Sequence, residues 1–346
     1  MKELIVNSLE AGQRFDKYLV KFMPNASKSF LYKMLRKKNI LLNGKKADGS
    51  EKIAEGDSVK VFFSDETLEK FTGKITSAQK EESGAQVSGA KPGAFKLSVL
   101  YENDDFLAVN KPSGMLSQKA DKNDVSLVEY IEQYLLDKGH YNPSSAYRPG
   151  ICNRLDRNTS GIVVAGKSVL GLQKMSEAFR NRTIAKYYIC VVKGKIAKRA
   201  VIKGYLSKDT KANKALVSDN PCDEGESGKY SEIETEYIPV AGNDNVTLLK
   251  VHLITGKTHQ IRAHLAHIGH PVAGDTKYGN YELNKSYRKK YKITSQMLHA
   301  FELNVPQAEG EKQLCIKTPV PEEFIEVLKG EKLWGPGIPE DLEALH

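Results

Sequence analysis

The sequence predicts a two-domain protein that contains both α-helices and β-strands. Its 346 residues exceed a typical single domain, and length alone gives a prior of about two domains. Segments with apolar residues at helical spacing alternate with strand-like segments, and no internal repeat is visible. Hydrophobic residues make up 40% of the chain and charged residues 27%, so a packed core is expected and wholesale disorder is excluded.

The cellular compartment is expected to be the cytoplasm, without contact to a membrane. The longest apolar runs, such as 161–165, are far shorter than the roughly 20 residues that span a bilayer. Residues 1–6 lack the apolar region of a signal peptide. The cysteines are scattered and form no CxxC pair, which argues against a disulfide framework or a Cys-rich zinc site.

The net charge of +9 points to a polyanionic partner, because 52 Lys and Arg stand against 43 Asp and Glu. In a cytosol the usual polyanion is nucleic acid. Residues 1–63 hold 13 Lys and Arg against 7 Asp and Glu, so +6 of the +9 falls in this short segment. A charge that serves only solubility is the alternative.

Residues 1–63 also show a regular pattern of elements. Phe15, Leu19 and Phe22 recur at the spacing of a helix, and Ser27 is a suitable N-cap for a second helix over about 28–38. The segment 40–46 reads as a strand that runs into an Asn-Gly turn, and 58–63 reads as a further strand after the turn at 55–57.

A cluster of cations is expected on one face of the second helix. Lys33, Arg36 and Lys37 lie opposite the apolar side chains of that helix, and the next turn adds Lys45 and Lys46. A patch of one sign is typical of phosphate binding, whereas a solvated helix face is the simpler alternative. The order of these segments resembles the small alpha-L RNA-binding domain of ribosomal protein S-four. The resemblance implies that these five residues bind RNA.

The remaining chain divides by composition. Residues 64–96 include small, polar and aperiodic stretches, which predicts a flexible linker. Residues 97–330 alternate strand-like and helix-like segments and form the second domain, and 331–346 form a C-terminal tail.

The most informative stretch is 148–166, where Asp156 stands between Arg154 and Arg157, just before an apolar run. The run 162–166 is consistent with a buried strand, so Asp156 is expected on the loop that enters it. Burial raises the pKa of a carboxylate and adjacent cations lower it. A carboxylate held ionised in a dry site suits a nucleophile or general base. Alternatively, Asp156 caps a turn and the arginines are surface charges.

The segment Arg154-Leu-Asp156-Arg-Asn-Thr-Ser-Gly161 resembles the catalytic motif of pseudouridine synthases of the RluA type. Further segments agree in order with motifs of this family: 110–114, 186–194, 256–262 and 269–279. In the second of these, the register of the family selects Tyr188 over Tyr187. One departure is Asn153, where the family usually has His, and an amide still donates and accepts hydrogen bonds.

The resemblance implies an α+β fold, with a mixed, mostly antiparallel sheet and flanking helices in the catalytic domain. It implies that Asp156 starts the reaction at the sugar of a uridine, and that Arg262 pairs with Asp156 and orients it. Tyr188 then packs on the uracil and moves a proton. Arg154 engages a phosphate or fills the gap left by the flipped nucleotide. Lys111 and His259 are expected to contact the RNA.

No cofactor and no metal are expected, because the isomerisation of uridine involves no net redox change or hydrolysis. His259, His264, His267 and His270 do not place three imidazoles on one helix face, and no HExxH motif is present. The expected substrate is large-subunit ribosomal RNA, by analogy of the domain layout, and the expected state is a monomer. A non-catalytic RNA-binding factor for ribosome assembly and a metal-dependent nuclease are the alternatives.

Overall fold

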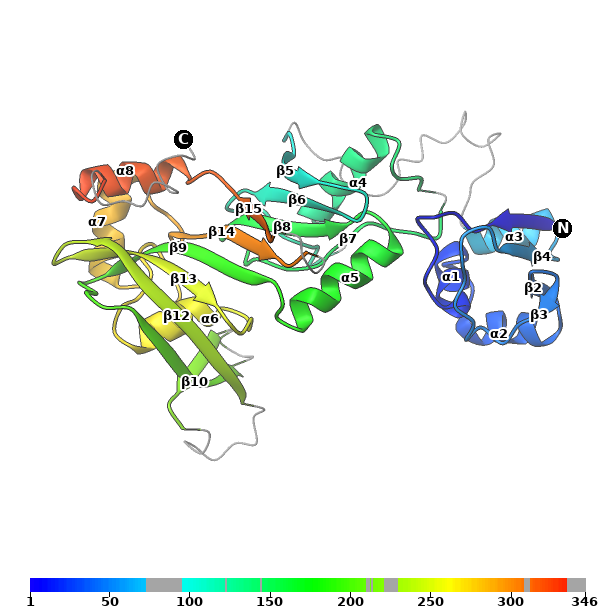
Figure 1. Ribbon diagram of the computed structural model, residues 1–346, viewed down its shortest axis with the longest axis horizontal. Helices are drawn as coiled ribbons and strands as arrows, with labels where there is room; N and C mark the ends of the chain where they lie inside the picture. Colours follow the sequence, from blue (N-terminus) through cyan, green and yellow to red (C-terminus); the bar gives the residue numbers. More distant parts are fainter. Residues whose placement is uncertain are drawn as a thin grey trace.

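The computed structural model describes residues 1–72, 95–121, 123–143, 145–209, 212, 214–220, 230–307 and 312–334. These residues form a small N-terminal unit and a larger second unit, which lie at opposite ends of the molecule (Figure 1). The first contains a four-stranded sheet and the second an eleven-stranded sheet.

The N-terminal unit packs its helices and its sheet around one apolar core. Its elements are β1 (Lys2–Ile5), α1 (Phe15–Phe22), α2 (Lys28–Arg36), β2 (Ile40–Leu42), β3 (Lys45–Lys46), β4 (Ser58–Val61) and α3 (Asp65–Thr72). The sheet is antiparallel, with the strand order β1-β4-β2-β3. The helices and strands expected between residues 15 and 61 are therefore confirmed.

Local chemistry explains these elements. The hydroxyl of Ser27 accepts a hydrogen bond of 3.2 Å from the backbone N–H of Phe30, which caps α2 as the sequence predicts. Asn43 and Gly44 both have positive φ, at 52° and 71°. Two such residues form the tight turn that matches the twist of a two-stranded hairpin.

The expected linker begins too early, because residues 65–72 form helix α3. Leu68 is buried in the N-terminal core, and the ring of Phe71 lies 4.6 Å from that of Phe30 between centroids. Two apolar side chains three residues apart share one helix face, which is enough to anchor this otherwise charged segment. Residues 73–94 of the expected linker lie outside the described residues.

The second unit is an α+β structure, as predicted. Its elements are β5 (Ser98–Glu102), β6 (Phe106–Lys111), α4 (Leu127–Asp137), β7 (Gly150–Ile151), β8 (Ser160–Gly166), α5 (Val169–Arg180), β9 (Ala185–Lys193), β10 (Ala200–Asp209), β11 (Lys214–Ser218), β12 (Ser231–Gly242), β13 (Val246–Leu253), α6 (Gln260–His267), α7 (Tyr281–Tyr291), β14 (Leu298–Val305), β15 (Leu314–Lys317) and α8 (Glu322–Gly330). The main path of the sheet runs β11-β10-β12-β13-β9-β14-β8-β6-β5.

This sheet is mixed and mostly antiparallel, because among the named strands of the described chain only β14 and β8 pair in parallel. Strand β14 lies between β9 and β8, and it brings together two segments that carry the motifs noted above. The expected tail also starts later than residue 331, since Leu333 is buried and Trp334 packs against the same apolar cluster as α8. Residues 335–346 lie outside the described chain.

The two units are in direct contact. The backbone N–H of Val169, at the start of α5, donates a hydrogen bond of 2.9 Å to the carbonyl of Leu9. The buried carboxylate of Glu10 accepts a hydrogen bond from the backbone N–H of Ala146. Among the described residues, no helix is both long and apolar enough to traverse a lipid bilayer.

Candidate active site

Asp156 lies on the loop between β7 and β8, as expected from the buried run that follows it. Ser117 fixes this loop, because its hydroxyl both donates to the carbonyl of Leu155 and accepts from the N–H of Leu155. Gly161 ends the loop with a φ of 112°, and a Cβ there would stand 2.2 Å from the carbonyl oxygen of Ala300. Only glycine fits this close approach of β8 to β14.

Arg262 joins two carboxylates. From α6, its Nη1 donates a hydrogen bond of 2.8 Å to Asp156, and its Nε and Nη2 bind Asp275 at 2.6 and 2.9 Å. The side chains of Arg262 and Asp275 are 5% and 0% exposed, whereas that of Asp156 is 25% exposed. The two hydrogen bonds to Asp275 therefore hold the guanidinium in place, and the third hydrogen bond orients the partly exposed carboxylate of Asp156.

The same contacts explain the electrostatics of the buried pair. Burial alone would raise the pKa of the Asp275 carboxyl, but the hydrogen bonds and the charge of Arg262 outweigh it and lower that pKa. Burial opposes the charged form of Arg262 as well, and its two carboxylate partners still raise the guanidinium pKa above its usual value. Both groups are ionised at neutral pH.

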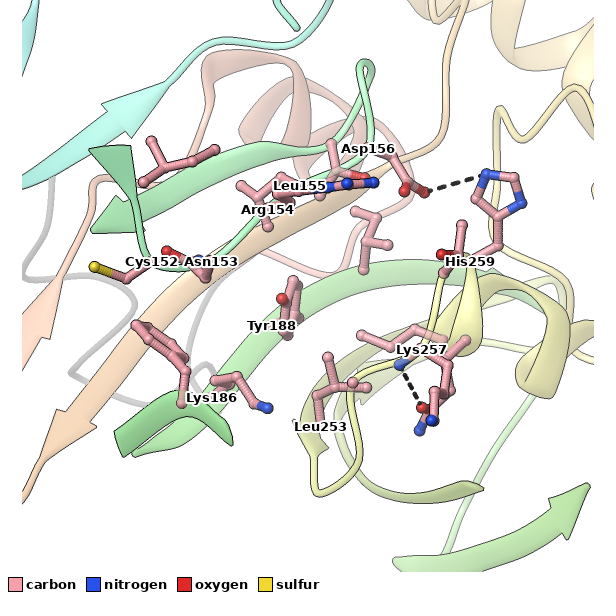
Figure 2. Close-up of a pocket in the computed structure, with 18 of the residues that line it drawn as sticks. Cys152, Asn153, Arg154, Leu155, Asp156, Lys186, Tyr188, Leu253, Lys257 and His259 are labelled. Carbon is pink, nitrogen blue, oxygen red and sulfur yellow. Dashed lines mark hydrogen bonds and ion pairs between the residues drawn. The ribbon is translucent and has the colours of Figure 1, made fainter. Parts of the chain in front are cut away.

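A cavity of about 730 Å³ opens beside Asp156, and its walls come from the β7–β8 loop, β9, the end of β13 and the start of α6. Figure 2 shows Asp156, Tyr188 and His259 facing this space. Arg154 also lines it. The structure thus brings together Asp156, Arg154, Tyr188, Arg262 and His259, which the sequence places on three separate segments.

The tyrosine that lines the cavity is Tyr188. Tyr187, the next residue of β9, points to the other face of the sheet, where its ring stacks on His252 at 4.8 Å. Burial raises the pKa of the Tyr188 phenol, and the negative charge of Asp156 raises it further. The phenol is therefore neutral at physiological pH.

His259 lies at the edge of the cavity in a left-handed backbone conformation with φ 58°. Its Nδ1 is 3.0 Å from the hydroxyl of Tyr278, and its Nε2 is 3.9 Å from the carboxylate of Asp156. Burial lowers the pKa of the imidazole, and this outweighs the opposing effect of Asp156. A neutral imidazole can donate or accept a hydrogen bond within the cavity.

Lys111 lies in the interior of the protein, whereas the sequence predicts that it contacts RNA. It is fully buried, and its ammonium group donates hydrogen bonds of 2.9, 2.8 and 3.0 Å to the carbonyls of Pro112, Met115 and Arg157. Burial lowers its pKa to about 7. Both faces of β6 are covered by apolar clusters, and the buried lysine at its end ties the turn after β6 to the loop that carries Asp156.

Asn153, the departure from the family pattern, has a structural role. Its side-chain N–H donates to the carbonyl of Ile162 at 3.1 Å, and its side-chain oxygen accepts from the N–H of Val164 at 2.8 Å. The neutral amide satisfies both backbone groups of β8, so the loop is held without an ionisable group at this position.

The cations expected to bind RNA in the N-terminal unit are exposed, and none of them lines the cavity within the described chain: Lys33, Arg36, Lys37, Lys45 and Lys46. Two other residues were missed by sequence reasoning. Asp275 is 13 residues from Arg262 on a turn, and no periodic pattern links the two. Lys186 lines the cavity and would be found from its place two residues before Tyr188 on one strand.

Comparison with known proteins identifies relatives of this chain. Residues 105–267 match the family model described as RNA pseudouridylate synthase. The chain is 30% identical over 313 residues to the ribosomal large subunit pseudouridine synthase C of Vibrio cholerae, covering 90% of each chain. It is 28% identical over 338 residues to the protein of the same name from Pasteurella multocida, covering 95% of this chain and 93% of the relative.

Solved structures show the same fold. The human RNA pseudouridylate synthase domain containing 4 superposes with a TM-score of 0.57 at 22% identity, over 69% of this chain and 94% of that one. Residues 105–267, which match the family model, include the loop of Asp156, the strand of Tyr188 and the helix of Arg262. This chain therefore belongs to the RluA-type family of RNA pseudouridine synthases.

Proposed function

We propose that this protein isomerises specific uridines of large-subunit ribosomal RNA to pseudouridine. The observation that carries the proposal is the carboxylate of Asp156, which faces the cavity beside Tyr188 and is held by Arg262 at 2.8 Å. Relatives that match at least nine-tenths of their own length bear the name of large-subunit enzymes, which supports ribosomal RNA as the substrate.

The reaction breaks the bond from the ribose C1′ to N1 of uracil and forms a bond from C1′ to C5. Asp156 starts it at the sugar, as nucleophile or as base, and its fixed partner Arg262 orients it through the hydrogen bond of 2.8 Å. The rotated base gains a proton at N1 and loses one from C5, so no atom is left over. The target nucleotide must leave its stack to reach the cavity.

Other side chains of the cavity position the nucleotide in this proposal. Arg154 is exposed at the rim and engages a phosphate or fills the gap left by the flipped nucleotide. His259 contacts the target nucleotide through its neutral imidazole. The chemistry of these groups requires no cofactor and no metal.

Tyr188→Phe keeps the ring that packs on the uracil and removes only the hydroxyl. Because the phenol is neutral at physiological pH, its loss removes a proton carrier and leaves the stacking surface. We expect RNA affinity to stay within about twofold and the rate to fall by about 10²- to 10⁴-fold. Single-turnover assays measure this. Tyr187→Phe, on the opposite face of the sheet, is the matched control and keeps the wild-type rate. Equal rates in Tyr188→Phe and wild type would reduce Tyr188 to a packing role.

The N-terminal unit is an RNA-binding domain in this proposal. Its exposed cations on α2 and β3 carry the charge that phosphates require, and its order of elements resembles the alpha-L domain. Attachment to the second unit raises the effective concentration of RNA at the cavity without touching the chemistry.

Replacing Lys33, Arg36 and Lys37 by Ala tests this domain without unfolding it, because all three side chains are exposed. Each lost phosphate contact lowers the slope of log affinity against log salt by about 0.7–0.9. We therefore expect weaker binding to long structured RNA and a flatter salt dependence, measured by filter binding between low and high salt. Activity on a short RNA at saturating concentration stays at the wild-type level.

A control triple variant removes the same charge from exposed lysines of the second unit: Lys138, Lys198 and Lys329. It is expected to bind long RNA with nearly the wild-type salt slope. If the α2 variant and this control behave alike, the charge of the N-terminal unit serves solubility and the RNA-binding assignment is wrong.

The protein is further proposed to act as a monomer in the cytoplasm. The scattered cysteines fit a reducing compartment, and Cys152 and Cys190 are free thiols. Light scattering of the purified protein and cell fractionation measure these two properties. The proposed activity is tested by incubating the protein with ribosomal RNA and counting pseudouridines.

A further inference from the structure

Lys186 is a buried cation that faces the cavity. It lies two residues before Tyr188 on β9, so the two side chains leave the strand on the same face, roughly 7 Å apart along it. Its exposed fraction is 9%. Within the described part of the chain, its ammonium group has neither a hydrogen bond nor an ion pair. Figure 2 shows Lys186 on the other side of Tyr188 from Asp156.

The surroundings of Lys186 make the charged form of its side chain less favourable. Burial lowers the pKa of the lysine, and neighbouring Arg182 lowers it further. Among the described residues that line the cavity, Asp156 is the only carboxylate, and it is already bound to Arg262. The end of the cavity near Lys186 therefore gathers positive charge, and no carboxylate among the described lining residues is free to balance it.

Arg182 occupies a position where glycine is usual. It follows the last turn of α5 with φ 60°, and its N–H bonds to the carbonyl of Phe179 while that of Thr183 bonds to Ala178. These two hydrogen bonds define the helix ending that favours glycine in the left-handed position. Here an arginine takes that conformation, and its side chain lines the cavity.

We propose that Lys186 and Arg182 form a phosphate site, which binds one of the two phosphodiester groups that flank the target uridine. The inference rests on the proposed function, because it takes the uridine to lie at Asp156 and Tyr188. The phosphate supplies an anion for Lys186, and the guanidinium of Arg182 donates hydrogen bonds to two of the phosphate oxygens. A contact of this kind fixes the position of the nucleotide and does not read its base.

The first test replaces each cation by a residue that folds at least as well. Lys186→Met removes a buried charge without a partner, and Arg182→Gly relieves the left-handed backbone. We expect both variants to melt at or above the wild-type temperature. Each is expected to lose about 10- to 100-fold in kcat/KM on a ribosomal RNA fragment that the wild type modifies, mostly through KM. Lys329→Met, on the exposed face of α8, is the matched control and keeps wild-type kinetics.

The second test locates the phosphate. RNA fragments are prepared with a single neutral methylphosphonate linkage, placed in turn at each position around the target uridine. For the wild type, we expect the methylphosphonate at one flanking linkage to lower kcat/KM by about the factor by which Lys186→Met lowers it on unmodified RNA. For Lys186→Met, the methylphosphonate at that linkage is expected to cause no further loss of kcat/KM. At every other linkage, it is expected to lower kcat/KM of Lys186→Met by the same factor as for the wild type. Independent, multiplied losses at both flanking linkages would overturn the assignment.

A third measurement separates this inference from the function on which it rests. The affinity for the same RNA fragment is measured against salt for the wild type and Lys186→Met, and the slope is expected to fall by about 0.7. An active wild type with an equally active and equally binding Lys186→Met overturns the phosphate site and leaves the proposed function in place. A wild type that makes no pseudouridine in ribosomal RNA contradicts the function itself, whatever the slopes.

Discussion

Asp156→Asn is expected to form pseudouridine no faster than background, a loss of at least about 10³-fold in rate. The asparagine keeps the size of the side chain and an oxygen that accepts the hydrogen bond from Arg262. It loses the negative charge that attacks or deprotonates the sugar in the proposed reaction. Arg262 stays paired with Asp275 through two hydrogen bonds, so the architecture of the site is retained. Pseudouridine counted after incubation with ribosomal RNA measures the effect.

The affinity of Asp156→Asn for RNA is expected to change by no more than about twofold, since removing one carboxylate near a polyanion does not weaken binding. Its melting temperature is expected to match that of the wild type. Asp244→Asn is the matched control, because the side chain of Asp244 is 90% exposed and lies outside the cavity. Substantial turnover by Asp156→Asn would contradict the role given to this carboxylate.

Arg262→Ala is expected to lose both activity and stability. The substitution leaves the fully buried carboxylate of Asp275 without its partner and frees Asp156 from its orienting bond. Breaking a buried ion pair on one side costs about 3–5 kcal/mol of unfolding free energy. Urea unfolding at pH 7 measures the loss, and the pseudouridine assay is expected to show background activity.

A double variant and the pH dependence of stability test the buried ion pair further. The double variant Arg262→Met with Asp275→Asn removes both charges, so it is expected to recover much of the stability while activity stays absent.

The change of stability with pH follows from the pKa of Asp275. The folded-state pKa of Asp275 is lowered, so its stabilising effect is present above its unfolded value of 3.8 and is lost as the pH falls through the folded value. The stability difference between wild type and Arg262→Ala therefore narrows below about pH 4. A variant Arg262→Ala as stable as wild type would contradict the buried pair.

The sequence predicts the local elements well where one face is clearly apolar. Helix α1 follows from the spacing of Phe15, Leu19 and Phe22, and the hairpin of β2 and β3 follows from its Asn-Gly turn. The buried run of β8 places Asp156 at the entrance of a strand. These features depend on neighbours within one turn or one hairpin, so they can be read from a short window.

Contacts between residues far apart in the chain are harder to predict from the sequence. The position of β14 between β9 and β8 determines where Tyr188 and Asp156 meet, and it depends on pairings more than 100 residues apart. The sequence predicts that Lys111 contacts RNA, yet its side chain is buried. Helix α3 was missed because its two buried side chains stand among charged residues, where the apolar stripe is weak. Asp275 contacts Arg262 across a turn with no periodic relation to it.

The central claim is tested most directly by mapping pseudouridines in total RNA from cells with and without this protein. We expect defined sites in large-subunit ribosomal RNA to lose pseudouridine when the gene is deleted. Wild-type protein restores these sites, whereas Asp156→Asn at the same expression level leaves them as uridine. A map that is unchanged by the deletion, or one that Asp156→Asn restores in full, would contradict the account.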